Sequence, residues 1–194
     1  MWMRTAFYIL FLLLSVDTWG QSAQAKKLSS AAVKLTHTKV VYDPAYFSIP
    51  YPNGDVPAGK GVCTDVVIRA YRKLGIDLQK DVHEDMKANF KLYPKFWGRK
   101  TTDSKIDHRR VYNLMVFFDR KGVKKPMTKI ASDYLPGDIV SWNLGGNITH
   151  IGLVIDQKSS DGKRFLIVHN IGRGQEISDC LFAWKIIGHH QYKI

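Results

Sequence analysis

Three residues, Cys63, His150 and His169, have the types and the setting that nucleophilic catalysis by a thiol requires. Cys63 lies near the start of residues 61–75, where apolar side chains recur at helical spacing and Gly75 is placed to end a helix. Unpaired N–H groups and the helix dipole at a helix start favour an anion. The pattern therefore predicts a reactive thiol whose pKa lies below the ordinary value of about 8.5.

Each histidine belongs to an apolar run that is typical of a β-strand. His150 opens residues 150–155, His169 lies near the end of residues 165–170, and a turn sequence separates the two runs. If the runs pair as a hairpin, both imidazoles lie at the same end of the sheet. His150 would then take the Cys63 proton and return it to the leaving amine. His169 would orient His150, and the Cys63 N–H would form part of an oxyanion hole.

Other interpretations of these residues stay open. The chain has two cysteines, and Cys63 and Cys180 would form a disulfide readily in an oxidising compartment. A zinc ion held by Cys63, His150 and His169 is another possibility, although the three include no closely spaced ligand pair. Either histidine alone is more simply a polar residue at a strand end. We favour a free Cys63 nucleophile, and we expect no metal and no other cofactor.

Residues 1–25 have the pattern of a secretory signal peptide. Arg4 supplies a positive charge, residues 7–14 are apolar, and Ala23 and Ala25 form a small-residue cleavage site. The apolar run is too short to span a bilayer comfortably. We therefore expect cleavage near Ala25 and a periplasmic or secreted protein without a stable membrane span. Residues 26–194 are predicted to form a single domain that acts as a monomer.

The chain is strongly basic, with a formal net charge of +12. An exported basic protein meets acidic partners such as anionic lipids or the carboxylates of peptidoglycan stem peptides. The predicted compartment makes nucleic acid an unlikely partner, and we expect none. The charge therefore favours peptidoglycan or its stem peptides as the partner.

Helical patterns precede strand patterns along the chain. Helices are predicted in residues 27–40, 78–90 and 107–121, and strands follow from residue 139. This order predicts an α+β fold with an antiparallel sheet. Asp107 is a natural N-cap for the third helix, but the next residues, Arg109 and Arg110, are unfavourable near a helix start. Such a conflict indicates a function, and either arginine could hold a substrate carboxylate. The alternative is a salt bridge to Asp103 or Asp107.

Several motifs resemble those of known families. The order of a cysteine at a helix start, residues 136–140 (PGDIV), 150–154 (HIGLV) and 167–169 (IVH) is similar to NlpC-type cell-wall cysteine peptidases of the papain-like clan. More closely, residues 42–189 resemble a family of secreted bacterial proteins labelled as a domain of unknown function. The motifs of that family are found here as residues 61–66 (GVCTDV), 106–111 (IDHRRV), 136–140 and 169–172 (HNIG).

The peptidase resemblance implies a papain-like (NlpC-type) fold, in which an N-terminal helical lobe packs on a C-terminal antiparallel sheet. It assigns Cys63 as nucleophile, His150 as base and His169 as third residue, and it makes Tyr51 the tyrosine that lines the active site. It also implies an exported cysteine peptidase or amidase that hydrolyses amide bonds in peptidoglycan stem peptides. The alternative is a non-catalytic cell-wall binding module on the same fold. The candidate substrate-binding residues are Tyr51, Asp65, Arg109 and Arg110.

One departure from the peptidase motif concerns the residues around the cysteine. The peptidases have Asp before the cysteine and Ser-Gly after it, whereas this chain has Val62 before Cys63 and Thr64-Asp65 after it. In several such enzymes that Asp helps to hold the free amine of the substrate. A carboxylate at Asp65 beside a thiolate would raise the pKa of the thiol unless its side chain turns away.

Overall fold

The computed structural model describes the backbone of residues 16–194 and the side chains of residues 23–96 and 98–194. The helices of this part of the chain are α1 (Val16–Leu35), α2 (Cys63–Arg72), α3 (Leu78–Ala88) and α4 (Val111–Lys121). The strands are β1 (Val41–Tyr42), β2 (Lys60–Gly61), β3 (Val123–Lys124), β4 (Ile139–Asn143), β5 (Thr149–Lys158), β6 (Phe165–Asn170), β7 (Gln175–Ser178) and β8 (Lys185–Gln191).

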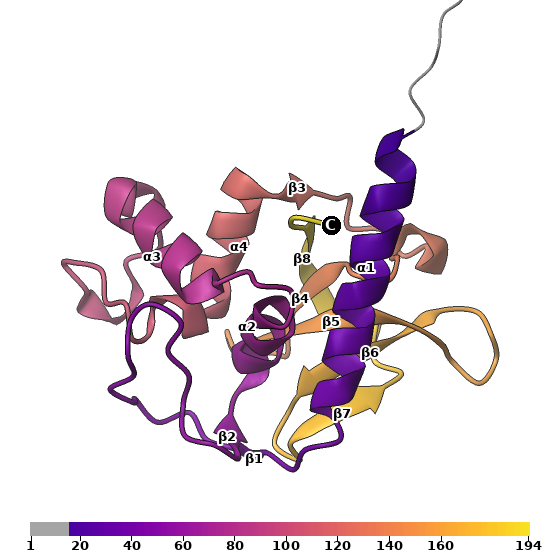
Figure 1. Cartoon of the computed structure of the whole chain (residues 1–194), viewed down its shortest axis with the longest axis horizontal. Helices are drawn as coiled ribbons and strands as arrows, with labels where there is room; N and C mark the ends of the chain where they lie inside the picture. The colour runs from indigo at the N-terminus through magenta and orange to yellow at the C-terminus, as the bar shows by residue number, and fades with distance from the viewer. Residues whose placement is uncertain (1–15) are drawn as a thin grey trace, which may run out of the picture.

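Six of these strands form one antiparallel sheet in the order β3-β8-β4-β5-β6-β7, so that β3 and β7 are its edges. Helices α1 and α2 pack against each other and against β5, and α2 also reaches β6 (Figure 1). Helices α3 and α4 pack together beside α2. The structure confirms a mixed fold in which helices precede and cover an antiparallel sheet. Between residues 16 and 194 we find no helix that combines the length and the apolar character of a membrane span.

Alternate side chains of the central strands build two cores on opposite faces of the sheet. On the side of α2, Ile151, Leu153 and Val168 join a large helix-side core that includes Cys63. The residues between them point the other way, into a smaller cluster that we call the tryptophan cluster. Its buried members are Tyr134, Val140, Trp142, Val154, Ile167, Cys180 and Leu181. The two cysteines therefore belong to different cores.

Helix α2 forms where the sequence predicts it. Val62 has no side chain that can cap the helix, and the Asp65 carboxylate instead accepts the Val62 N–H at 2.7 Å. At the other end Gly75 has a φ of +78°, the left-handed conformation that glycine adopts readily. Most of the helix is buried, and its first residue is Cys63. The cysteine therefore occupies the helix start, as predicted.

The hairpin of β5 and β6 is also confirmed, with Leu153 opposite Val168. This register places Gly152 beside His169, two residues from His150. A Cβ at position 152 would lie 3.2 Å from the His169 Cβ and 2.9 Å from the Val168 carbonyl oxygen. Glycine at 152 therefore lets the two strands approach closely beside the histidines.

Two predicted helices differ from those observed. A helix is predicted for residues 27–40, whereas the observed helix α1 includes Val16 and ends at Leu35. Just after this end, Thr36 Oγ1 donates to the Val33 carbonyl at 2.8 Å. The predicted cleavage position after Ala25 therefore lies within α1, while the apolar run 7–14 lies outside the described residues.

The third predicted helix begins later than expected. Asp107 is not its N-cap, because residues Asp107–Arg109 form a 3-10 turn and the Asp107 carboxylate accepts the Asp103 N–H at 2.6 Å. Helix α4 starts only at Val111. Arg109 thus lies outside the helix, whereas Arg110 is its N-cap residue, so the predicted conflict with the helix dipole remains for Arg110 alone.

Candidate active site

The Cys63 thiol is buried at the start of α2, and its side of the helix faces β5. Backbone N–H groups of Ile151, Thr64 and Cys63 itself are directed at the sulfur, and each of them favours the thiolate. Ile151 is the residue that follows His150 in β5. The helix start and the strand thus supply several donors around one sulfur atom.

Burial outweighs these donors. Removal of the sulfur from water, with a smaller contribution from the nearby Asp65 carboxylate, raises the pKa of the Cys63 thiol to about 12. The prediction of a lowered pKa is therefore wrong for the ligand-free protein. The reason is that a helix start activates a thiol only where water or a cation can also stabilise the charge.

His150 and His169 form a hydrogen-bonded pair, with Nε2 of His150 lying 2.9 Å from Nδ1 of His169. Both rings are buried. The ring of Trp184 contacts both of them edge-on, at centroid distances of 5.9 and 6.4 Å, and Trp142 lies 5.8 Å from His150. Burial lowers the pKa of His150 to about 3 and that of His169 to about 4, so both rings are neutral near pH 7.

The far end of the pair meets strand β7, which the sequence analysis missed. Nε2 of His169 lies 2.5 Å from Ser178 Oγ and 3.9 Å from a carboxylate oxygen of Glu176. Glu176 is directly opposite His169 in the β6–β7 register. A strand of four half-buried residues shows no alternation of apolar and polar side chains, so nothing in the sequence marked it.

The structure brings Cys63 to the part of β5 that carries His150. Thr149 and Ile151 flank His150 in the chain, and both lie at the cysteine. The Ile151 N–H is directed at the sulfur, and Thr149 lines the same cavity as Cys63. With its Nε2 bonded to His169, His150 has only Nδ1 left to receive a proton from a neighbouring group. His150 itself is not among the residues that line the cavity, and its ring packs against Trp142 and Trp184. The structure thus brings together the hydrogen-bonded histidine pair, while the approach of His150 to the thiol remains a prediction.

The cavity at Cys63 has a volume of about 160 Å³. Tyr42 lines it, whereas Tyr51, predicted to do so, does not. Tyr51 is 40% exposed and its ring packs edge-on against His83 of α3 at 5.1 Å. Tyr42, the last residue of β1, therefore takes the place at the cysteine that was predicted for Tyr51 in the loop that follows. The lining residues are Tyr42, Pro44, Val62, Cys63, Ile106, Arg109, Arg110, Val111, Tyr112 and Thr149.

Asp65 and Arg109, both predicted to bind substrate, bind each other instead. The Arg109 Nε lies 3.0 Å from Asp65 Oδ1 and its Nη2 lies 3.1 Å from Oδ2, with both side chains buried. Arg109 also donates to the Ala45 carbonyl at 3.1 Å. The sequence suggests Asp103 or Asp107 as the partner of Arg109. The observed partner is Asp65, an acid 44 residues away. Because the guanidinium neutralises Asp65, this carboxylate disturbs the thiol less than the sequence suggests.

Arg110 remains at the cavity. It lines the same space as Cys63 and is half-buried. Burial and the neighbouring Arg99 and Arg109 lower the pKa of its guanidinium, which nevertheless stays charged near pH 7. Of the two arginines predicted to meet a carboxylate, Arg110 is the one whose position still suits that role.

Both cysteines are free thiols. The predicted alternative of a Cys63–Cys180 disulfide does not fit this fold, because the two residues lie in cores on opposite faces of the sheet. In the part of the chain that the structure describes, no three His, Cys, Asp or Glu side chains are grouped so that they could hold a metal ion.

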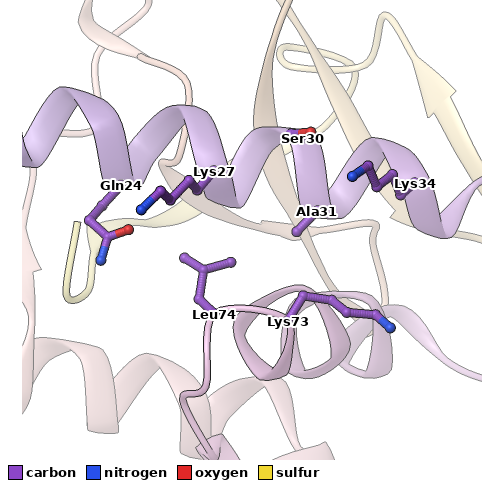
Figure 2. Close-up of a pocket in the computed structure, with 7 residues that line it drawn as sticks. All are labelled: Gln24, Lys27, Ser30, Ala31, Lys34, Lys73 and Leu74. Atoms are coloured by element: carbon purple, nitrogen blue, oxygen red, sulfur yellow. The ribbon is translucent and has the colours of Figure 1, made fainter.

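A larger cavity, of about 560 Å³, lies between α1 and the C-terminal end of α2 (Figure 2). Lys27, Lys34 and Lys73 line it, together with Ala31, Leu74, Gln24 and Ser30. No cysteine and no histidine is among these lining residues. This cavity is therefore basic but lacks the groups for acyl transfer, which lie around Cys63.

The raised pKa of Cys63 predicts slow alkylation. Iodoacetamide should modify the ligand-free protein much more slowly at pH 7 than it modifies an unhindered thiol, and the rate should rise up to pH 10 without a plateau. Burial also raises the pKa of Cys180, to about 11, so the Cys180→Ala variant isolates the Cys63 signal. A plateau reached below pH 8 would contradict the expectation, because it would reveal a thiolate–imidazolium pair in the resting protein.

The buried histidines predict a loss of stability in mild acid. Burial lowers the pKa of His108 and His150 to about 3 and that of His169 to about 4, whereas an unfolded chain takes up these protons below about pH 6.5. Unfolding therefore binds protons, and the free energy of unfolding should fall as the pH drops from 6.5 towards 4. The slope is up to about 1.4 kcal/mol per pH unit for each histidine.

Urea unfolding at a series of pH values measures this slope. The variant His108→Asn should reduce it, and the same change at the exposed His37 should leave it unaltered. Equal slopes in all three proteins would mean that other groups cause the acid lability.

Comparisons with known proteins give one relative by sequence and one solved structure with a similar fold. The chain is 53% identical to a protein of Escherichia coli (strain K12) named "Uncharacterized protein YijF". The alignment spans 165 residues, which are 85% of this chain and 80% of that protein. The fold is similar to that of an N-acetylmuramoyl-L-alanine amidase from Bacteroides uniformis ATCC 8492. The TM-score is 0.50 at 12% identity, over 89% of this chain and all of that one.

A family model described as "Domain of unknown function (DUF1287)" matches residues 29–192, which include Cys63, both histidines and β7. The match covers most of the chain and begins within α1. The protein therefore belongs to the DUF1287 family.

Proposed function

We propose that this protein is an exported cysteine peptidase or amidase, of the papain-like NlpC type, which hydrolyses amide bonds in peptidoglycan stem peptides. The observation that carries the proposal is the arrangement at one end of β5. A cysteine at a helix start lies beside the strand that carries His150, and His150 is hydrogen-bonded to a second histidine. The pairing of a nucleophile, a base and an orienting group is the general requirement of acyl transfer by a thiol.

In this reaction His150 takes the Cys63 proton on Nδ1 as the sulfur attacks the amide carbonyl carbon. Because thiol and imidazole are both neutral at rest, proton transfer and attack are coupled. Backbone N–H groups at the start of α2 stabilise the oxyanion. Collapse of the tetrahedral intermediate breaks the C–N bond, and His150 gives the proton to the leaving amine. A water molecule then hydrolyses the thioester with His150 again as base.

Two observations support a cell-wall substrate. The formal charge of +12 suits a polymer rich in carboxylates. The solved protein with a similar fold is titled an N-acetylmuramoyl-L-alanine amidase, an enzyme that acts on an amide. The signal peptide pattern of residues 1–25 agrees with a periplasmic or secreted location, and the protein is proposed to act as a monomer without a cofactor.

The proposal is tested by incubating the purified protein with muropeptides and determining the products by mass spectrometry. We expect two fragments whose masses identify the amide bond that is cut. Intact muropeptides after prolonged incubation, across pH 5 to 9, would overturn the proposal.

A second function, a non-catalytic cell-wall binding module, is favoured by one observation. The cavity at Cys63, at about 160 Å³, is smaller than the usual range of ligand pockets, and the thiol in it is buried. Under this alternative, muropeptides bind to the protein and are recovered unchanged. The product assay separates the two functions directly.

Arg110 provides a test of the substrate class. If its guanidinium binds a stem-peptide carboxylate, Arg110→Ala should raise KM by about tenfold or more, since a charged hydrogen bond contributes about 1.5–3 kcal/mol. The melting temperature should change little. Arg173→Ala, at an exposed position, is the matched control and should leave both values unchanged. An unaltered KM in Arg110→Ala would exclude this contact.

A further inference from the structure

Strand β7 places two polar side chains at the outer nitrogen of His169. Ser178 Oγ lies 2.5 Å from Nε2, and the nearest carboxylate oxygen of Glu176 lies 3.9 Å from it. On its other side, Nδ1 of His169 is 2.9 Å from Nε2 of His150. Three groups from β5 and β7 therefore share the two ring nitrogens of one buried histidine.

The protonation of this series is constrained by chemistry. A neutral imidazole has one N–H donor and one acceptor nitrogen. For His150 to accept the Cys63 proton on Nδ1, its own proton must be on Nε2, where it donates to Nδ1 of His169. The proton of His169 must then be on Nε2, and it points towards β7. If His169 were the other tautomer, His150 would present an N–H to the thiol and could not act as a base.

The groups on β7 favour the productive tautomer. An ionised carboxylate only accepts hydrogen bonds, so Glu176 attracts a proton to Nε2 of His169. Ser178 can accept that proton and still donate its own hydroxyl hydrogen to the Cys180 thiol, with which it is hydrogen-bonded. Ser178 thus has an acceptor for its hydrogen, which leaves its lone pairs available to His169.

We propose that Ser178 and Glu176 are positioning residues that hold His169 as the Nε2–H tautomer, and through it hold His150 as a base towards Cys63. This inference deepens the proposed function and rests on it. The other groups that face His169 are the His150 ring and the Trp184 ring. Neither of these competes for Nε2, since His150 bonds to Nδ1 and the Trp184 contact is edge-on.

Nitrogen-15 NMR of the histidine rings tests the inference in the ligand-free protein. The shifts of Nδ1 and Nε2 report directly which nitrogen carries the proton. We expect the Nε2–H tautomer for both His150 and His169 in the wild type near pH 7. In the double variant Ser178→Ala/Glu176→Gln we expect a mixture of tautomers, since the carboxylate and the hydroxyl are both removed.

Kinetics give the second readout. A histidine forced into the wrong tautomer loses about 10⁴-fold in kcat in a serine protease triad, which is an upper limit here. We expect Ser178→Ala and Glu176→Gln each to lower kcat by about tenfold with little change in KM, and Ser178→Thr, which restores a hydroxyl, to recover most of the loss. The matched control is Ser141→Ala, because Ser141 is a buried strand serine whose hydroxyl has no hydrogen-bond partner.

The inference is overturned if wild-type His169 carries its proton on Nδ1, or if the double variant keeps the wild-type tautomers and kcat. It is also overturned if Ser178→Thr remains as slow as Ser178→Ala while both fold. An inactive wild type would defeat the proposed function, but the NMR measurement would still decide the tautomer. The two failures are therefore distinguishable.

Discussion

Replacing Cys63 by alanine should lower the hydrolysis of muropeptides by at least about a thousandfold, because a thiol hydrolase without its nucleophile retains only binding and oxyanion stabilisation. The rate of product formation, followed by mass spectrometry, measures the effect. The loss should appear in kcat, while the affinity for muropeptides changes little.

The chain contains its own matched control for this experiment. Cys180 is also a buried free cysteine, yet it lies in the tryptophan cluster on the other face of the sheet. Cys180→Ala removes the acceptor of the Ser178 hydroxyl but leaves the nucleophile in place, so it should lower kcat by no more than the roughly tenfold loss expected of Ser178→Ala. His150→Ala should be almost as inactive as Cys63→Ala, and the double variant should be no slower, since the two groups act as a unit. Comparable losses in Cys63→Ala and Cys180→Ala would mean that the effect comes from packing.

The largest expected effect on stability comes from the buried pair of Asp65 and Arg109. Removing the carboxylate by Asp65→Ala leaves a buried guanidinium without its partner and leaves the Val62 N–H without its acceptor. Breaking such a pair from one side costs about 3–5 kcal/mol in the free energy of unfolding. Chemical denaturation of the variant and the wild type measures the difference.

An exposed acid that lies before the same helix and pairs with two of its arginines is the control. Asp55, with a side chain 37% exposed, pairs with Arg69 and Arg72 at 2.9 and 2.8 Å. Because solvent screens these charges, Asp55→Ala should cost only about 1 kcal/mol or less. If both variants lost the same stability, the burial of the Asp65–Arg109 pair would not be what makes it important.

The parts of the site that the sequence predicted are those with a local pattern. The helix that begins at Cys63 shows helical periodicity and a terminal glycine, and the hairpin with His150 and His169 consists of two apolar runs around a turn. Each of these patterns lies within about 20 residues. Family resemblance pointed to the same three residues and to the family itself.

The parts that the sequence did not predict depend on contacts between distant segments. The partner of Arg109 is 44 residues away, and the choice between Tyr42 and Tyr51 depends on how a loop without regular structure folds over the cysteine. The depth at which the sulfur of Cys63 is buried is likewise a property of the packed helix and sheet. The raised pKa of the thiol therefore could not be derived from its position in the helix.

The place of β7 at the edge of the sheet has a consequence for how the protein responds to heat. An edge strand of four residues, paired on one side only, opens at a lower free-energy cost than the central strands. Its backbone amides should exchange with solvent faster than those of β5, and its detachment would remove Ser178 and Glu176 from His169. On warming, activity should therefore decline reversibly several degrees below the temperature at which the whole domain melts.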